Sequence, residues 1–193
     1  RILESLHMGC VSYQRRFFVD GVITKGRCDQ AYRAAYMELL NIREEFRAQG
    51  WRDCVGSSGT YLAIAEILRA QSRGSITRSG LHALRDQLIQ CGHVDKLGSI
   101  VGLKAARHGV IAAGTAIACA IMDALEIDAM RASSGALREG AIYDLIGRLQ
   151  HEDVRERTVS ALLRRSGVPE FHARRVEQVA DALFVQVAAD LGL

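Results

Sequence analysis

Residues 55–60 read Val55-Gly56-Ser57-Ser58-Gly59-Thr60, a turn rich in glycine and hydroxyl groups that joins two predicted elements. A short strand is predicted over residues 51–55, and a helix over residues 61–69. Glycine lets the backbone approach an anion closely, and the free N–H groups at the start of the following helix carry its positive dipole end. The stretch therefore predicts an α/β fold with an anion-binding turn at the end of a strand.

Two further stretches share this pattern of a short apolar strand, a glycine-centred turn and a helix. They are Ile111-Ala112-Ala113-Gly114-Thr115 and Ala132-Ser133-Ser134-Gly135-Ala136. In an open sheet such turns gather at the carboxyl ends of the strands, where ligands bind. One such turn is usually only a tight turn, but three in a small domain favour a shared site. The hypothesis requires Gly56, Gly114 and Gly135 to lie around one groove.

The rest of the chain alternates between extended and helical patterns. Extended segments are predicted over residues 2–8, 11–19, 110–112 and 127–132, with the second of these extended or mixed. Helices are predicted over residues 25–49, 78–91, 116–125, 136–149, 153–165 and 171–191, and an irregular stretch over residues 93–108. Thr24 and Thr77 are suitable N-caps, and Gly50 and Gly92 are suitable helix stops.

Two features of this pattern bear on domain organisation. The helix over residues 116–125 is apolar on almost every side, which predicts that it is buried on every side. After Arg148 the composition changes to charged amphipathic helices. The predicted domains are therefore residues 1–148 and residues 149–193.

Composition narrows the class of protein. Of the 193 residues, 49% are apolar, which is enough for a hydrophobic core, and the net charge is only +3. That charge is too small to indicate nucleic acid as a partner, and no apolar run reaches the ~18 residues needed to span a bilayer. The five cysteines and six histidines form no CxxC, HxH or HxxxH pair. No metal site is predicted in this chain, and the cysteines are expected to be reduced thiols.

Several segments resemble the exopolyphosphatase/guanosine pentaphosphate phosphatase (Ppx/GppA) family. The most specific is Gly135-Ala136-Leu137-Arg138-Glu139-Gly140, which continues through Tyr143-Asp144-Leu145. The others are residues 4–11 (ESLHMGCV) with Arg16-Phe17-Phe18, residues 55–60 (VGSSGT) and residues 153–158 (DVRERT). Their order and spacing also match, so the resemblance covers nearly the whole chain.

The resemblance implies a fold and an activity. The fold is an actin-like (ribonuclease H-like) lobe with a mixed sheet and flanking helices, here partial, followed by the start of a helical domain. The activity is hydrolysis of terminal phosphoanhydride bonds of inorganic polyphosphate or guanosine pentaphosphate with Mg²⁺. The family's first-lobe catalytic glutamate and its Asp-x-Gly-Gly-Gly-Ser loop are not found in these 193 residues. The resemblance also implies a cytoplasmic homodimer.

Candidate site residues follow from the turns and from the resemblance together. No catalytic residue is expected in this chain. The residues expected to bind phosphate or nucleotide are Gly56, Ser57, Ser58, Gly59, Thr60, Ala113, Gly114, Gly135 and Arg138. Arg138 could instead form a structural ion pair with Glu139. Ser134 stands where the family commonly has aspartate.

Three functions remain open on the sequence. In the first, the chain is part of a phosphatase and is inactive alone. In the second, it is a non-catalytic module that binds polyphosphate or guanosine phosphates. The third, an ATP-dependent kinase of the same superfold, is disfavoured because the run from Gly135 to Gly140 resembles the phosphatases.

Overall fold

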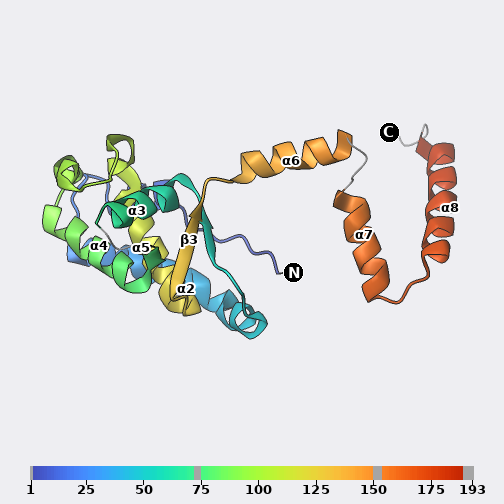
Figure 1. The fold of residues 1–193 in the computed structure, drawn as a ribbon, viewed down its shortest axis with the longest axis horizontal. Helices are drawn as coiled ribbons and strands as arrows, with labels where there is room; N and C mark the ends of the chain where they lie inside the picture. The colour runs from blue at the N-terminus through green and yellow to red at the C-terminus, as the bar shows by residue number, and fades with distance from the viewer. Residues whose placement is uncertain (1, 72–74, 150–153, 189–193) are drawn as a thin grey trace. The chain divides into compact units, whose positions relative to one another are not determined.

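The computed structural model describes residues 2–71, 75–149 and 154–188, which divide into two compact units. The first unit spans residues 1–136 and the second spans residues 137–193. The first carries a sheet and most of the core, whereas the second is helical (Figure 1). The division falls before the helix at residues 137–149, earlier than the predicted boundary at residue 148, which stays a prediction.

A three-stranded mixed sheet confirms the predicted α/β class. Its strands are β1 (Val55–Ser57), β2 (Ile76–Thr77) and β3 (Ala129–Ser133), in the spatial order β1-β3-β2. β1 runs parallel to β3, and β2 runs antiparallel to it. Because β1 and β3 are parallel, their carboxyl ends lie at one edge of the sheet, where the chain turns into the following helices.

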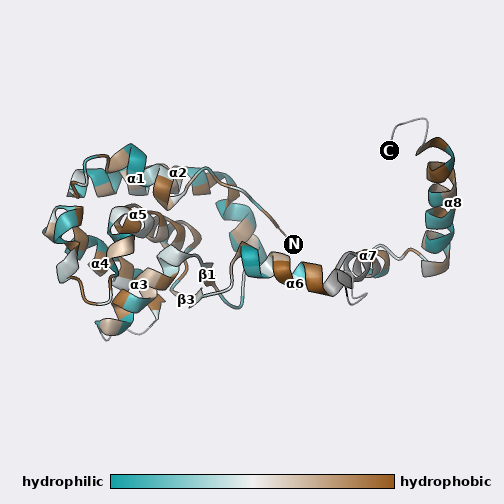
Figure 2. Ribbon diagram, turned by 90° about the horizontal axis from the view of Figure 1, so that it is seen from above, coloured by the Kyte–Doolittle hydropathy of each residue, from teal (hydrophilic) through white to brown (hydrophobic). Residues whose placement is uncertain are grey.

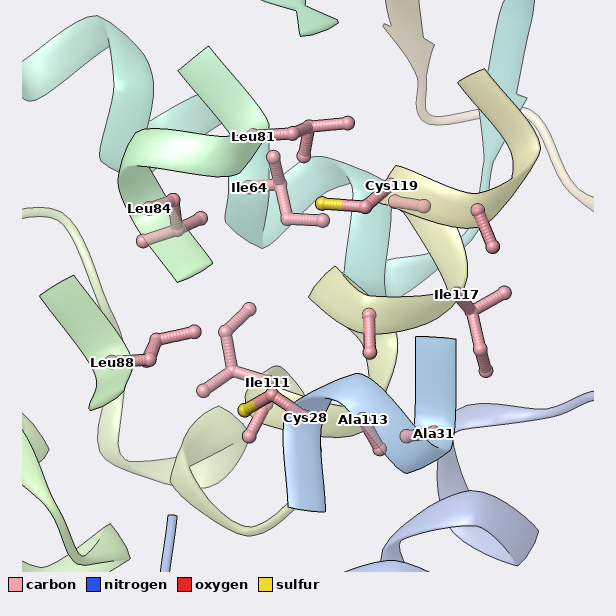
Figure 3. Packing of buried hydrophobic residues seen from close by; sticks show 14 of the residues in the cluster. Cys28, Ala31, Ile64, Leu81, Leu84, Leu88, Ile111, Ala113, Ile117 and Cys119 are labelled. Carbon is pink, nitrogen blue, oxygen red and sulfur yellow. The ribbon is translucent and has the colours of Figure 1, made fainter. Parts of the chain in front are cut away.

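The helix α5 (His108–Leu125) forms the centre of the first unit. It packs against four other helices, which are α1 (Cys10–Phe17), α2 (Lys25–Gln49), α3 (Gly59–Ala70) and α4 (Arg78–Cys91). Figure 2 shows α5 between α2 and α3. Around it, Cys28 and Ala31 of α2 and Leu88 of α4 are buried (Figure 3). The predicted burial of the apolar helix on every side is confirmed.

The start of α5 corrects one prediction. The strand over residues 110–112 and the turn over residues 113–115 are both wrong, because α5 runs unbroken from His108 to Leu125. Ala113 and Gly114 lie inside the helix and are buried. A strand there would have no neighbouring strand to pair with, whereas a helix satisfies its own backbone and buries its apolar side chains against α2 and α3.

Two other predictions of extended structure are also wrong. Residues 2–8 form no strand, and residues 10–17 form the helix α1. The aromatic residues that suggested a strand lie four apart, and the rings of Tyr13 and Phe17 meet edge to face at 5.3 Å between centroids. Tyr13 is buried against the core, so packing overrides the strand preference of aromatic residues. The strand predicted over residues 51–55 is displaced, because β1 begins only at Val55.

Helix caps were predicted accurately. The Thr24 hydroxyl accepts a hydrogen bond from the Arg27 N–H, and the Thr77 hydroxyl accepts one from the Gly80 N–H. Gly50 and Gly92 end α2 and α4 with positive φ angles of 66° and 74°. The stretch predicted as irregular contains two short 3₁₀ helices, η1 (Val94–Ser99) and η2 (Ala105–Arg107).

The second unit consists of three helices in its described part. They are α6 (Leu137–Leu149), α7 (Val154–Arg165) and α8 (Glu170–Ala188), at the positions that the sequence predicted. Residue 153 and residues 189–191, which were also predicted to be helical, lie outside the described residues.

One helical stretch meets the length and composition of a membrane span. It runs from Ala105 to Leu125 and is 72% buried inside the first unit. Because α5 is the core helix of that unit, its apolar character is accounted for by packing, and no membrane span is established.

The residue that ends α5 offers a stability test. Glu126 has a φ of 58°, the positive value that glycine adopts without strain, and its carboxylate pairs with Arg47 at the surface. We expect Glu126→Gly to raise the free energy of unfolding by about 1 kcal/mol relative to Glu126→Gln. Both variants lose the ion pair, so urea unfolding of the two isolates the backbone term. Equal stability of the two variants would contradict the claim that the backbone of Glu126 is strained.

Candidate functional site

Two of the three predicted turns between a strand and a helix, called corners below, meet at the carboxyl edge of the sheet. They are the turns after β1 and after β3. Ser57 at the end of β1 lies in register with Ser133 at the end of β3. The Ser57 hydroxyl donates a hydrogen bond to the Gly135 carbonyl oxygen, and the Gly135 N–H donates to the Ser133 hydroxyl at 3.1 Å. Figure 2 shows β1 and β3 side by side. The turns that follow the two strands are therefore tied together.

The first corner presents the start of α3. Ser58 caps this helix, and its hydroxyl accepts hydrogen bonds from the N–H groups of Thr60 and Tyr61 at 3.2 and 3.3 Å. The Gly59 N–H, the first of the helix, has no acceptor among the described residues. A free amide at the positive end of a helix dipole is a suitable donor to an anion.

A guanidinium group lies directly against Gly59. A Cβ built on Gly59 would stand 2.1 Å from Nη2 and 2.6 Å from Cζ of Arg107, so any larger residue at this position would push the end of this flexible side chain aside. Arg107 comes from η2, immediately before α5, and is partly exposed. In the described part of the chain it has no carboxylate partner. A cation beside the positive end of a helix is stabilised by an anion between them.

Four of the predicted site residues serve packing instead. Gly56 is buried, and a Cβ there would stand 2.5 Å from Cγ of Tyr61. Burial raises the pKa of Tyr61 to about 12, so its hydroxyl stays protonated. Gly114 allows the Thr60 methyl group to lie against α5, since a Cβ on Gly114 would stand 2.3 Å from it. Thr60 and Ala113 are buried as well.

The outcome for the predicted groove is therefore mixed. Ser57, Ser58, Gly59 and Gly135 lie together, are at least partly exposed, and keep their predicted role as a hypothesis. Gly114 lies behind Thr60 in the core rather than on the edge of a groove. The turns after β1 and β3 lie together, whereas Gly114 in α5 packs against Thr60 behind the first of these turns.

Arg138 belongs to the second unit. It pairs with Glu139 at 3.1 Å between Nη2 and Oε1, so the predicted alternative of an ion pair is confirmed. Binding of phosphate by Arg138 stays a prediction.

The sequence did not predict a role for Arg107. It lies in the stretch predicted to be irregular, and no motif around it indicates phosphate. One signal was available, because a charged residue that precedes a helix buried on all sides must lie at the end of that helix, where the chain reaches the surface.

Metal binding and cysteine chemistry find little support in the described residues. No three His, Cys, Asp or Glu side chains converge there as metal ligands would. Burial raises the pKa of the Cys28 thiol to about 11 and that of the Cys119 thiol to about 12. Both therefore stay protonated and unreactive at neutral pH.

The chain is similar to curated proteins of known family. A protein of Aeromonas hydrophila subsp. hydrophila, named guanosine-5'-triphosphate,3'-diphosphate pyrophosphatase, is 42% identical over 188 residues, which is 97% of this chain. The protein of the same name from Aeromonas salmonicida is 40% identical over 188 residues. The chain spans 38% of the length of each of these relatives.

Solved structures show the same fold. The Ppx/GppA family member of Aquifex aeolicus aligns with a TM-score of 0.63 at 19% identity, over 77% of this chain and 49% of that one. An exopolyphosphatase-like protein aligns with a TM-score of 0.63 at 17% identity, over 76% of this chain and 51% of that one. The predicted likeness to an actin-like lobe is confirmed at the level of fold. The sequence profile of the Ppx/GppA phosphatase family matches residues 1–149, and the chain therefore belongs to that family.

Proposed function

We propose that this chain forms the phosphate-binding half of a site that hydrolyses terminal phosphoanhydride bonds, and that it is inactive alone. The observation that carries the proposal is the Arg107 guanidinium against Gly59 at the start of α3. The hydroxyl of Ser57, tied to Gly135, lies at the same edge of the sheet. Arg107 and the Gly59 N–H supply positive charge and hydrogen-bond donors, whereas the Ser57 hydroxyl, whose hydrogen goes to the Gly135 carbonyl oxygen, holds the two turns together.

Guanosine pentaphosphate is the proposed substrate in the first place, and inorganic polyphosphate in the second. The curated relatives are named for guanosine-5'-triphosphate,3'-diphosphate, and membership of the family is what relates their substrate to this chain. Both substrates present a run of phosphate groups, and the corner described here would bind that shared chemistry.

The corner fits binding and charge stabilisation better than proton transfer. Enzymes that move phosphoryl groups depend mainly on positioning and on stabilising the charge of the transition state. The Arg107 guanidinium would neutralise phosphate oxygens, and the Gly59 N–H would donate to one of them. The contacts described above involve hydroxyls, backbone groups and this guanidinium, and none involves a carboxylate. A catalytic base would therefore come from outside these residues.

Magnesium is implied by the family, but no carboxylate is among the groups described around Gly59 and Gly135, so its protein ligands would come from elsewhere. Mg²⁺ in phosphoryl-transfer sites is held by one or two carboxylates together with phosphate oxygens. No cluster of three acidic, histidine or cysteine side chains exists in the described ranges. We derive no step through the ion. The cytoplasmic location and the homodimer that the resemblance implies remain proposals.

A non-catalytic binding module is the second candidate, because the same donors would bind phosphate without hydrolysing it. Isothermal titration of the chain with guanosine pentaphosphate and with polyphosphate separates the two. Tight, saturable binding without turnover favours the module, whereas weak binding favours half of a shared site.

Phosphate release tests the proposed inactivity. We expect the purified 193-residue chain with magnesium chloride to release no phosphate from polyphosphate or guanosine pentaphosphate above the blank, since the corner lacks a base. A full-length member of the family serves as the positive control. Turnover by the chain at a rate matching that control would contradict the proposal.

A further inference from the structure

The segment that carries Arg107 is fastened along α3. This segment, residues 100–107, is called the strap below. It begins at Ile100, which is 2% exposed and buried in the core, and it ends in η2 at Arg107. It lies against Glu66 and Ile67 in the middle of α3 and reaches Gly59 at the start of that helix. The strap therefore runs antiparallel to α3 over about two helical turns.

Gly102 is the point of closest approach. Its φ is +86°, and a Cβ there would stand 2.8 Å from the carbonyl oxygen of Glu66 and 3.0 Å from Cα of Ile67. Both are backbone atoms in a helix that is itself buried on one side, so they cannot move aside as a flexible side chain could. Only glycine allows the strap to lie this close to α3 in this conformation.

An ion pair fastens the strap on the other side of this contact. Nζ of Lys104 lies 3.2 Å from Oε1 of Glu66. The Lys104 carbonyl oxygen accepts a hydrogen bond from the Arg107 N–H at 2.9 Å, which closes the turn of η2. Glu66 is thus contacted twice, through its backbone by Gly102 and through its carboxylate by Lys104.

We propose that Gly102 and the Lys104–Glu66 pair are positioning elements that hold the Arg107 guanidinium over Gly59. The inference rests on the proposed function, because it concerns the same anion site. A strap displaced from α3 would move Arg107 away from Gly59, since only two residues lie between it and Lys104. The fold of the first unit depends mainly on α5 and its neighbours, so the strap sets the affinity for phosphate rather than the fold.

Glycine substitutions give the first test. We expect Gly102→Ala to weaken binding of inorganic tripolyphosphate, followed by titration calorimetry, about fivefold or more. Gly98→Ala is the matched control, because Gly98 lies in η1 of the same region with open space around its Cα. It should bind as the unchanged chain does. Equal affinity of the two variants would overturn the proposed role of Gly102.

A charge exchange gives a second test that survives if Gly102→Ala does not fold. Lys104→Glu alone should weaken tripolyphosphate binding, and adding Glu66→Lys should restore most of it, because the pair is re-formed with its charges exchanged. Arg33→Glu, which removes the same two units of charge from an exposed position of α2, is the control for net charge, so a loss confined to Lys104→Glu and its recovery in the double variant report position. Failure of the second substitution to restore binding would overturn the role of the pair.

Arg107→Ala separates this inference from the proposed function. If Arg107→Ala weakens binding and neither strap variant does, the positioning role is wrong and the anion site stands. If Arg107→Ala binds tripolyphosphate as tightly as the unchanged chain, the anion site itself is wrong, and the positioning role fails with it.

Discussion

Gly114→Ala should lower the free energy of unfolding by about 1–3 kcal/mol, the usual result of overpacking a core. Alanine is the better helix former, so propensity alone predicts a gain of about 1 kcal/mol. The opposite sign is expected because the new methyl group would stand 2.3 Å from Cγ2 of Thr60, which is 8% exposed. Urea unfolding followed by the fluorescence of Trp51, the chain's one tryptophan, measures this in the first unit.

Two further variants make this result specific. Gly109 lies in the same helix with open space around its Cα, so Gly109→Ala should be neutral or stabilising. Thr60→Ser removes the methyl group that collides, and the combination with Gly114→Ala should recover much of the lost stability. If Gly114→Ala is as stable as Gly109→Ala, the close contact between α3 and α5 is wrong.

Arg107→Ala should weaken the binding of inorganic tripolyphosphate about tenfold or more. A hydrogen bond to a charged group contributes about 1.5–3 kcal/mol, and each 1.4 kcal/mol is about tenfold in affinity. The guanidinium lies against Gly59, where it can share a phosphate with the start of α3. Titration calorimetry of both proteins at one salt concentration measures the difference, because phosphate binding depends strongly on salt.

Arg33→Ala is the control for net charge. Arg33 is an exposed residue of α2 whose side chain donates a hydrogen bond to the Asp29 carbonyl oxygen. Replacing it with alanine removes the same unit of charge as Arg107→Ala. It should change the affinity little. Arg107→Lys should give an intermediate affinity, since lysine keeps the charge but not the planar set of donors. An equal loss in Arg33→Ala and Arg107→Ala would indicate general attraction in place of a defined site.

Three helices of the first unit, α2, α3 and α4, could be predicted because their signals are local. Thr24 and Gly50 mark the ends of α2, and Thr77 and Gly92 mark those of α4, through caps that need only neighbouring residues. The three helices of the second unit and β3 were placed for similar reasons. Side-chain period and capping groups act over a few residues, so the sequence displays them directly.

Gly114 shows why the strand and the turn predicted over residues 110–115 were wrong. A glycine can serve a turn through its conformational freedom, or it can serve a close contact through its missing side chain. Gly135 follows a strand at a true corner, whereas Gly114 lies inside a helix against Thr60. The two uses look alike locally, because the atom that needs the space comes from a residue 54 positions away.

The same limit applies to the site. Ser57, Ser58 and Gly59 could be predicted from their own turn, since the cap and the helix start are local. Arg107 could not, because it reaches that turn only through the packing of α5 and the strap. Its proposed role in anion binding depends on the fold rather than on any motif around it.

The most direct test of the account is to map where a phosphate chain binds. Amide resonances of the 193-residue chain would be followed by NMR during titration with inorganic tripolyphosphate. We predict saturable shifts centred on the amides of Gly59 and Gly135, and their loss in Arg107→Ala. Shifts that are absent there, or that centre on the arginines of α7 and α8, would contradict the claim that two strand ends and Arg107 form one anion site.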